Sequence, residues 1–334
     1  MIIVRLIIYV IHKIKNVSVL FDNIYQILLL RLLFLIYNIY NSSNIYNQYN
    51  YYNIIFTTIM IIVIKCIDQV GLVAVITRVV AKEQLNIVSM REHVDLVHNR
   101  FFMRLEVTHS DDGGPLEEKL RGVLPHDAAI HINPLPQKKV IVMVTKEYHC
   151  LADILIRNYY GTLGASVLAI IGNHTTLQDI CKRFDMPFFA VSHEQVSKHE
   201  FEEKITGIIE RYEPDYIILA KFMRILSPGL VAKFPMRIIN IHHSFLPAFI
   251  GSNPYKQAFE RGVKLIGATA HFVSNELDEG PIIAQQSISV NHSYTSADMV
   301  KAGKEIEMAV LATALKLVFE DRVFVYKNKT VVFD

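Results

Sequence analysis

The spacing of apolar residues predicts a small domain of mixed strands and helices in the first half of the chain. The β-branched run Ile61–Ile64 is typical of a strand, and Leu72, Ile76 and Val80 recur at helical spacing. Together with the elements given next, the order is βαββαβ over about 75 residues, which is within the size range of a domain. The further elements expected here are strands at Asn86–Val88, Phe101–Val107 and Ala129–Ile132 and a helix at Leu116–Leu124.

Beyond residue 139 the pattern changes to longer apolar runs that alternate with helical segments. The uninterrupted run Val140–Val144 is typical of a parallel strand buried on both faces of its sheet. The alternation predicts an α/β fold with a doubly wound, mostly parallel sheet, whose ligand crevice lies at the carboxyl ends of the strands. The expected strands are Val167–Ile171, Tyr216–Leu219, Arg237–Ile241 and Ala268–Val273; the expected helices are Leu151–Tyr159, Leu177–Phe184, Phe201–Tyr212, Tyr255–Arg261 and Ser296–Glu320, followed by a hairpin of Val323–Val325 and Thr330–Phe333.

These patterns also predict the domain boundaries. We expect a first domain at 60–132, a linker at 133–139 that contains two prolines, and a larger domain at 140–334. Residues 1–59 differ from the rest, because the first sixty residues contain no Gly, Ala, Pro or Glu. This composition follows A/T-rich codons, so we expect a low-complexity extension without function and a functional start near Met60.

Two alternatives exist for the extension. The run Ile27–Tyr37 could anchor the chain in a membrane, but Arg31 interrupts it and it is shorter than the roughly 20 apolar residues of a span. The segment could instead be a targeting peptide, but it lacks the Ser and Arg richness of a transit peptide and a small-residue cleavage site. We therefore expect no membrane association.

Composition restricts the class of protein further. A hydrophobic content of 51% with 20% charged residues is typical of a globular chain, and the net charge of +2 gives no electrostatic reason to expect nucleic acid or a membrane as a partner. The three cysteines, Cys66, Cys150 and Cys181, are far apart and odd in number. They have no disulfide or metal-binding spacing, which indicates a reducing compartment, the cytoplasm.

Candidate chemistry follows the strand expected at Arg237–Ile241. Asn240 and His242 stand at alternate positions, so they point to the same side of an extended chain where the strand ends. An Asn amide can stabilise a developing oxyanion, and a His changes protonation near neutral pH. An Asn-x-His pair by itself is nevertheless more often structural than catalytic.

A second strand, which carries Thr269 and His271, leads to a possible third catalytic group. Asp278 lies just before a Gly-Pro turn, where a carboxylate can be aimed into a crevice. An amide, an imidazole and a carboxylate suffice for acyl-carbon chemistry, because they can polarise a carbonyl, orient water and move a proton to a departing amine. Taken alone, Asp278 and Glu279 would be interpreted as a solvated loop.

A zinc site is not expected. Four histidines, His242, His243, His271 and His292, invite that hypothesis, but none has the helical i, i+4 spacing or the cysteine neighbours of known zinc sites.

Longer stretches around these residues resemble the folate-dependent formyltransferase superfamily, and within it the formyltetrahydrofolate deformylases. The resemblance runs from about Ile61 to Phe333, and its front part resembles an ACT domain, a βαββαβ module that commonly binds amino acids and pairs with copies of itself. The rear stretches that carry it are Asn240–Phe249, Pro254-Tyr255, Gly262–His271, Leu277–Pro281 and Arg322–Tyr326, and the front ones are Asp68, Gly71, Leu72 and Asn86–Val88.

The resemblance implies a role for each matching position. Asn240 and His242 would polarise the formyl oxygen, while Asp278 would hold the attacking water and tune His242. A segment lining the pterin pocket and a loop closing over the pterin would bind the substrate. The substrate-binding residues implied in this way are Met223, Arg224, Ile225, Leu226, Thr269, His271, Val273 and Leu277.

The turn after the first strand of the larger domain distinguishes water from other formyl acceptors. Purine-pathway transferases of the superfamily have a glycine-rich turn there, whose N–H groups bind the acceptor's phosphate. Here the turn Thr145–Cys150 has no glycine, and Glu147 and Tyr148 add negative charge and bulk. Water needs no phosphate site, so we predict hydrolysis of 10-formyltetrahydrofolate to formate and tetrahydrofolate.

Two other hypotheses stay open. The chain could be a formyltransferase acting on a ribonucleotide or aminoacyl acceptor, or a regulatory amino-acid binder with a silent catalytic half. The complete set of Asn240, His242 and Asp278 argues against a silent half. For the hydrolase, the resemblance implies a folate substrate, no metal or other cofactor, an amino-acid effector at the ACT domain, a homo-oligomer, and a supply of formate for purine biosynthesis that balances one-carbon pools.

Overall fold

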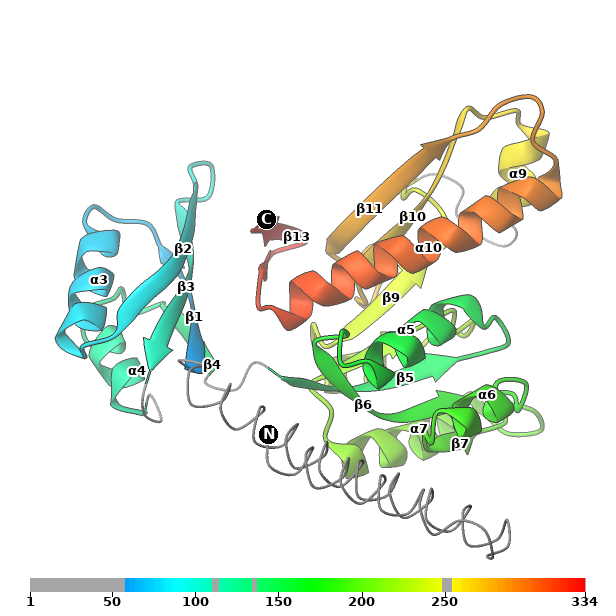
Figure 1. Ribbon diagram of the computed structural model, residues 1–334, viewed down its shortest axis with the longest axis horizontal. Coiled ribbons are helices and arrows are strands. Elements are labelled where there is room, and N and C mark those ends of the chain that lie inside the picture. The colour runs from blue at the N-terminus through cyan, green and yellow to red at the C-terminus, as the bar shows by residue number, and fades with distance from the viewer. Residues whose placement is uncertain (1–57, 110–113, 134–136, 248–253, 334) are drawn as a thin grey trace, which may run out of the picture. The chain divides into compact units, whose positions relative to one another are not determined.

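The computed structural model describes residues 58–109, 114–133, 137–247 and 254–333. These residues form a four-stranded sheet, a seven-stranded sheet and a two-stranded hairpin (Figure 1). Residues 59–334 cluster as one compact unit. The extension predicted at 1–59, including the run Ile27–Tyr37, lies outside the described residues except for Thr58 and Ile59, which belong to the first strand.

The four-stranded sheet is the predicted ACT-like domain. Its strands are ordered β2-β3-β1-β4, and the pairs β1–β4 and β2–β3 are antiparallel. Leu72, Ile76 and Val80 of α3 are buried against the sheet, so the helical spacing in the sequence marked the buried face. The elements are β1 (Thr58–Ile67), α3 (Leu72–Lys82), β2 (Asn86–Asp95), β3 (Arg100–His109), α4 (Gly114–Arg121) and β4 (Ala129–Asn133).

The seven-stranded sheet confirms the doubly wound α/β fold. Its order is β11-β10-β9-β8-β5-β6-β7, and the pairs from β9 to β7 are parallel. The strands are β5 (Lys138–Val144), β6 (Ala165–Gly172), β7 (Phe188–Ala190), β8 (Tyr216–Leu219), β9 (Ile238–His242), β10 (Leu265–Phe272) and β11 (Ile282–Ser289).

Helices cover both faces of this sheet. Val140, Val142 and Val144 of β5 are buried with α5 and α10 on one face, while Ile141 and Met143 are buried with α7 and α8 on the other. This is why the stretch Val140–Val144 of β5 has no polar residue. Figure 1 shows α10 running along one face of the sheet. The helices are α5 (His149–Tyr159), α6 (Gln178–Arg183), α7 (Lys198–Tyr212), α8 (Pro228–Lys233), α9 (Pro254–Glu260) and α10 (Ser296–Phe319).

Several features differ from the sequence-based expectation. The strands β7 and β11 and the helix α8 were not expected, and β10 runs antiparallel to β9. The predicted linker at 133–139 is also shorter, because Lys138 and Lys139 already pair with β6. Lys138 is buried in an ion pair of 2.8 Å with Asp321, which explains how a lysine fits inside a strand of the sheet.

The C-terminal hairpin of β12 (Val323–Tyr326) and β13 (Lys329–Val332) contacts both sheets. Phe324 and Phe333 are buried with Phe102 of β3. On the other side, the Asn328 amide donates to the Glu279 carbonyl at 2.8 Å, and the Thr330 hydroxyl donates to the Ile282 carbonyl at 2.5 Å. The hairpin therefore joins β3 to the loop that precedes β11.

Within the described part of the chain, no helix combines the length and the apolar character that a membrane span requires.

The central strand β8 gives a direct test of this core. Ile218 is fully buried between the sheet and its helices, so Ile218→Ala should destabilise the protein by about 2–5 kcal/mol through lost apolar burial and a residual cavity. Thermal unfolding of the variant should show a clearly lower midpoint. Ile156→Ala, at an exposed position of α5, is the matched control and should change stability by no more than about 0.5 kcal/mol. Equal effects of the two changes would contradict the assignment of the core.

Candidate active site

Asn240 and His242 lie at the carboxyl end of β9, which pairs with β10 in the sheet. In the antiparallel pairing of these strands, Asn240 lies opposite His271 and His242 lies opposite Thr269. Directly opposite residues of an antiparallel pair project to the same side. The period of two along each strand therefore brings four polar side chains to one side of the sheet.

The Asn240 amide is held by His271. The distance from Asn240 Nδ2 to His271 Nε2 is 3.2 Å, and His271 Nδ1 lies 2.8 Å from the Phe272 carbonyl oxygen. Because a carbonyl only accepts, His271 Nδ1 carries the proton and Nε2 accepts from Asn240. Asn240 Nδ2 has two hydrogens, so one stays available for a ligand oxygen.

Asp278 reaches this group from the loop after β10. The loop that follows Phe272 folds back onto that residue, because the Phe272 N–H donates to the Pro281 carbonyl at 2.9 Å. A side chain on Gly280 would overlap the Phe272 carbonyl, so only glycine allows the loop to close this tightly. Asp278 itself adopts a left-handed backbone with φ of 58°, and its Oδ1 lies 3.2 Å from His242 Nδ1.

The electrostatics of this contact favour an ionised carboxylate. Burial by itself would raise the pKa of Asp278, but the hydrogen bond from His242 and the nearby His271 ring outweigh burial and hold the pKa well below its ordinary value. On the opposite side of the His242 ring, Nε2 is buried and has no hydrogen-bond partner among the described residues. A buried ring nitrogen without a partner is the atom expected to face a substrate or a water molecule.

One cavity of about 320 Å³ contains this set. Three of the apolar residues in its wall are unusually exposed for their type: Met223 is 54% exposed, Ile225 62% and Leu277 55%. Such a wall suits a flat aromatic ligand, with the polar groups at one end fixing its orientation. The predicted residues that line the cavity are Met223, Arg224, Ile225, Leu226, Asn240, His242, His271, Val273, Leu277 and Asp278.

Thr269 is the predicted substrate-binding residue that the structure does not place with the others. It is fully buried and is not part of the cavity wall. Its hydroxyl donates to the Ser244 carbonyl at 2.9 Å and accepts from the Leu246 N–H at 3.1 Å. Thr269 therefore holds the chain that follows β9, and it does not line the cavity with the other predicted residues.

Lys221 and His243 were not predicted, although both line the cavity. Burial and the nearby Lys221 ammonium lower the pKa of His243 to about 4, so its imidazole is neutral at neutral pH. The signal that could have found Lys221 is its place two residues after β8, since polar residues near the carboxyl ends of parallel strands face the ligand crevice.

Comparison with known proteins identifies the family of both domains. Residues 138–315 match the Formyl transferase family and residues 60–125 match the ACT domain. The chain is 50% identical to the formyltetrahydrofolate deformylase of Haemophilus influenzae over 272 residues, which cover 81% of this chain and 98% of that protein. The crystal structure of a formyltetrahydrofolate deformylase from Pseudomonas syringae pv. tomato superposes with a TM-score of 0.79 at 36% identity, over 87% of this chain and all of that one.

The chain belongs to the formyltetrahydrofolate deformylase family. A more distant likeness links its larger domain to a transferase. Glycinamide ribonucleotide transformylase 1 from Symbiobacterium toebii superposes with a TM-score of 0.57 at 28% identity, over 60% of this chain and 95% of that one. The deformylase family thus shares the α/β domain of the transferases, so the side chains around the cavity must decide between hydrolysis and transfer.

One buried group of this deformylase-family chain has the residue types of a metal site. Ligand atoms of His149, Cys150 and Glu307 lie within 4.8 Å of one another. The Glu307 carboxylate is already engaged, however, at 2.7 Å by both His149 Nε2 and the Tyr255 hydroxyl. Burial raises the pKa of the Cys150 thiol, which keeps it protonated, whereas metal ligation requires a thiolate. These residues fit a hydrogen-bonded cluster better than a metal site.

The contact between His242 and Asp278 predicts a pH dependence of stability. Because the pKa of Asp278 is lower in the folded than in the unfolded chain, its ionised form stabilises the fold above the ordinary value of 3.8, and this stabilisation is lost as the pH falls from 3.8 through the folded value. The variant His242→Gln should raise the pKa of Asp278. We expect its urea unfolding midpoint to lie below that of the unmodified chain at about pH 6, with the gap narrowing below pH 3.8.

His292→Gln, at an exposed position, is the control for this comparison and should show no such gap. A gap for His242→Gln that stays constant through the acid range would contradict the contact.

Proposed function

We propose that this chain hydrolyses 10-formyltetrahydrofolate to formate and tetrahydrofolate. The observation that carries the proposal is the convergence of Asn240, His242 and Asp278 on one cavity. Membership of the deformylase family supports the same reaction.

Asn240 and His242 supply the two groups that act on the formyl group. The free hydrogen of Asn240 Nδ2 donates to the formyl oxygen and stabilises the negative charge that develops on it when water attacks. Because His242 Nδ1–H is donated to Asp278, Nε2 holds a lone pair and takes a proton from the attacking water. The same nitrogen then returns the proton to N10 of the folate, so that the C–N10 bond breaks and tetrahydrofolate leaves.

Asp278 positions both His242 and the water. Its Oδ1 fixes the tautomer of His242 and stabilises the imidazolium that forms during the reaction. No side chain of the described residues hydrogen-bonds to its Oδ2, which is therefore available to accept from the attacking water. The carboxylate, the imidazole and the amide each have one task, and the steps need no metal or redox cofactor.

The folate is proposed to bind along the apolar wall of the cavity. Met223 and Ile225 follow β8, and Leu277 lies on the loop after β10, so the pterin ring would lie between two segments. Arg224 is also part of the wall and is available to the carbonyl or glutamate oxygens of the substrate. We further propose that the formate supplies purine biosynthesis and that the protein is located in the cytoplasm. The three buried free cysteines support a reducing compartment.

Transfer to a ribonucleotide is less well supported. The turn after β5 leads into α5 without glycine, and Glu147 within it forms an ion pair of 2.6 Å with Lys304. Thr145 Oγ1 accepts from the Met223 N–H at 2.9 Å, which ties the turn to the segment after β8. A phosphate at this point would meet the Glu147 carboxylate and would have no glycine-rich turn to bind it.

The variant Asp278→Asn tests the reaction. It removes the charge that orients His242 but keeps the shape, so formate release from 10-formyltetrahydrofolate, without any acceptor present, should fall by about 100-fold or more. Asp179→Asn, at an exposed position of α6, should leave the rate unchanged. If Asp278→Asn retains full activity, or if turnover requires an added acceptor, hydrolysis by this set of residues is wrong.

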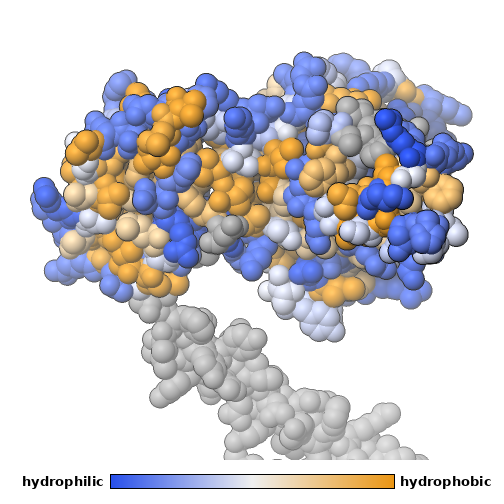
Figure 2. Space-filling model, turned by 90° about the horizontal axis from the view of Figure 1, so that it is seen from above, coloured by the Kyte–Doolittle hydropathy of each residue, from blue (hydrophilic) through white to orange (hydrophobic). Residues whose placement is uncertain are grey.

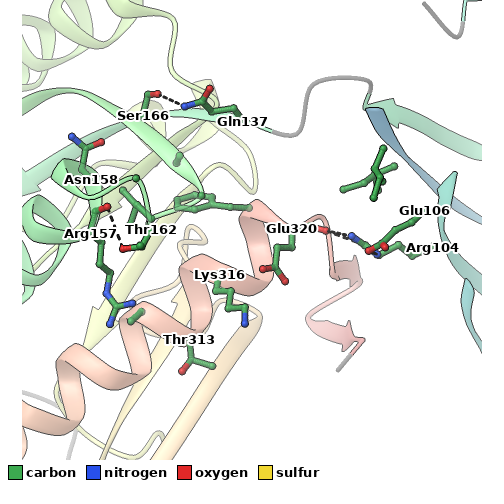
Figure 3. Close-up of a pocket in the computed structure, with 18 of the residues that line it drawn as sticks. Arg104, Glu106, Gln137, Arg157, Asn158, Thr162, Ser166, Thr313, Lys316 and Glu320 are labelled. Carbon is green, nitrogen blue, oxygen red and sulfur yellow. Dashed lines mark hydrogen bonds and ion pairs between the residues drawn. The ribbon is translucent and has the colours of Figure 1, made fainter. Parts of the chain in front are cut away.

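We further propose that the ACT domain binds a small amino acid and modulates catalysis in the domain that begins with β5. Contacts between the two support this. Arg104 of β3 donates from Nε and Nη2 to the Glu320 carbonyl at 3.0 and 2.8 Å, beside a cavity of about 1010 Å³ with charged side chains in its wall (Figure 3). The hairpin that packs on Phe102 also holds Glu279, next to Asp278.

A homo-oligomer is part of the same proposal. Apolar side chains reach the surface at several places on the face drawn in Figure 2. Among the exposed apolar residues are Val88 and Met90 of β2, which is an edge strand of its sheet. An exposed edge with apolar side chains favours pairing with a second chain.

Titration calorimetry with single amino acids tests the regulatory role. We expect one small amino acid to bind to the full chain and to change the rate of formate release. Binding should weaken when the contact to the catalytic domain is cut by Arg104→Ala, because coupling between sites is reciprocal. If none of the amino acids produces heat of binding, the regulatory proposal fails.

A further inference from the structure

A second buried carboxylate lies beside the active-site cavity and has no part in the mechanism above. Glu307 of α10 is 1% exposed. Its Oε1 accepts from the Tyr255 hydroxyl at 2.7 Å, and its Oε2 lies 2.7 Å from His149 Nε2 and 3.2 Å from Lys221 Nζ. We call these four residues the Glu307 cluster: His149, Lys221, Tyr255 and Glu307.

The cluster occupies the switch point of the sheet. The neighbouring strands β5 and β8 are where the chain changes direction across the sheet, and doubly wound folds bind their ligands in the crevice outside such a point. His149 opens the helix after β5, and Lys221 follows the end of β8. α9 and α10 supply the other two side chains. Four separate segments therefore converge where a crevice would otherwise open.

Two backbone positions are adapted to the side chains of the cluster. Gly303 lies one helical turn before Glu307, and a side chain there would overlap the Tyr255 ring, so α10 contains a glycine where the tyrosine packs. Lys221 has a left-handed backbone with φ of 61°, a conformation that glycine adopts without strain and lysine does not. The lysine at this position contributes an ammonium to Glu307 that glycine would lack.

The cluster borders the reacting groups. Lys221 lines the same cavity as Asn240 and Asp278. On the other side, the ring of His243 lies 6.4 Å from that of Tyr255 and 5.2 Å from that of His242. The cluster thus adjoins the cavity through Lys221, and it adjoins the His242 ring through Tyr255 and His243.

We propose that the Glu307 cluster fills the space from which a formyl acceptor larger than water would approach, and so restricts this enzyme to hydrolysis. This inference rests on the proposed function and assigns to named side chains the choice between water and another nucleophile. Specificity of this kind comes from a steric and electrostatic obstacle to the wrong substrate and not from a new attraction to the right one.

The charges keep the obstacle in place. Burial would raise the pKa of Glu307, but the hydrogen bond from His149, the Lys221 ammonium and the Tyr255 hydroxyl outweigh it and lower the pKa to about 2. An ionised carboxylate that is fully bonded inside the protein holds its partners rigidly, because any displacement would leave a buried charge without a partner.

Opening the crevice should let an amine compete with water. The amine nitrogen would attack the formyl carbon and form a new C–N bond, the C–N10 bond would break, and the proton lost by the amine would pass through His242 to N10. The products are a formamide and tetrahydrofolate. No oxidant or reductant is involved, and the reaction differs from hydrolysis only in the nucleophile.

The test is the ratio of products formed from 10-formyltetrahydrofolate in the presence of 2,2,2-trifluoroethylamine, a small amine that is uncharged at neutral pH. Fluorine NMR detects its formamide, and an enzymatic assay measures formate. In the double variant, Lys221→Gly removes the lysine side chain. Glu307→Gln replaces the carboxylate that would otherwise stay buried without its ion-pair partner. We expect the formamide-to-formate ratio of the double variant to exceed that of the unmodified chain by roughly tenfold or more.

A matched variant separates the effect of side-chain volume from the effect of side-chain charge on the product ratio. Lys221→Met with Glu307→Gln removes the same two charges but keeps a side chain of similar length, so it should produce formate with no increase in formamide. Lys233→Met breaks an exposed ion pair of 3.3 Å with Glu210 and should change neither product. If the double variant does not fold, Tyr255→Ala opens the same space from α9 and leaves the ion pair of Lys221 and Glu307 intact.

The outcomes are distinct. A higher formamide ratio in the opened variants alone supports the proposal. Opened variants that fold, release formate and make no more formamide than the unmodified chain overturn it, as does an unmodified chain that already formylates the amine. An unmodified chain that releases no formate would instead refute the proposed hydrolysis, which is a separate result.

Discussion

The active site depends on the return of the loop after β10 to the end of β9. Because β10 is antiparallel to β9, the chain leaves β10 beside the start of β9 and away from His242. The loop closes on Phe272, and Gly280 allows the close approach that turns Asp278 back toward the imidazole. Without this closure the amide and the imidazole would remain, but no carboxylate would fix the proton on His242 Nδ1.

Two buried carboxylates lie near the cavity, and their surroundings give them different roles. Asp278 has an oxygen that no described side chain engages, so it can hold a water molecule. Glu307 is engaged on both oxygens by neighbouring side chains and can accept little more. Both remain ionised because donors compensate burial. The oxygen of Asp278 that no described side chain engages suits a reacting group, whereas Glu307, with partners on both oxygens, suits a structural role.

The C-terminal segment connects these elements to the ACT domain. α10 carries Glu307, and it is followed by the hairpin that contacts Phe102 of β3 and the backbone of Glu279. The hairpin thus provides contiguous contacts from β3 to the neighbour of Asp278, and the proposed regulation by the ACT domain would use them.

The sequence alone determined the order of most of the elements, the buried face of α3, the two-sided burial of Val140–Val144 in β5 and the place of Asn240 and His242 on one side of a strand. Each of these follows from a period along the chain, which needs no knowledge of distant residues. It also indicated Asp278, through a turn whose shape is local. Tertiary structure alone decided the direction of β10, the burial of the Thr269 hydroxyl, and the meeting of Lys221 with Glu307. These depend on segments far apart in the chain, and a lysine at the end of a strand has the same sequence pattern whether it faces solvent or a buried carboxylate.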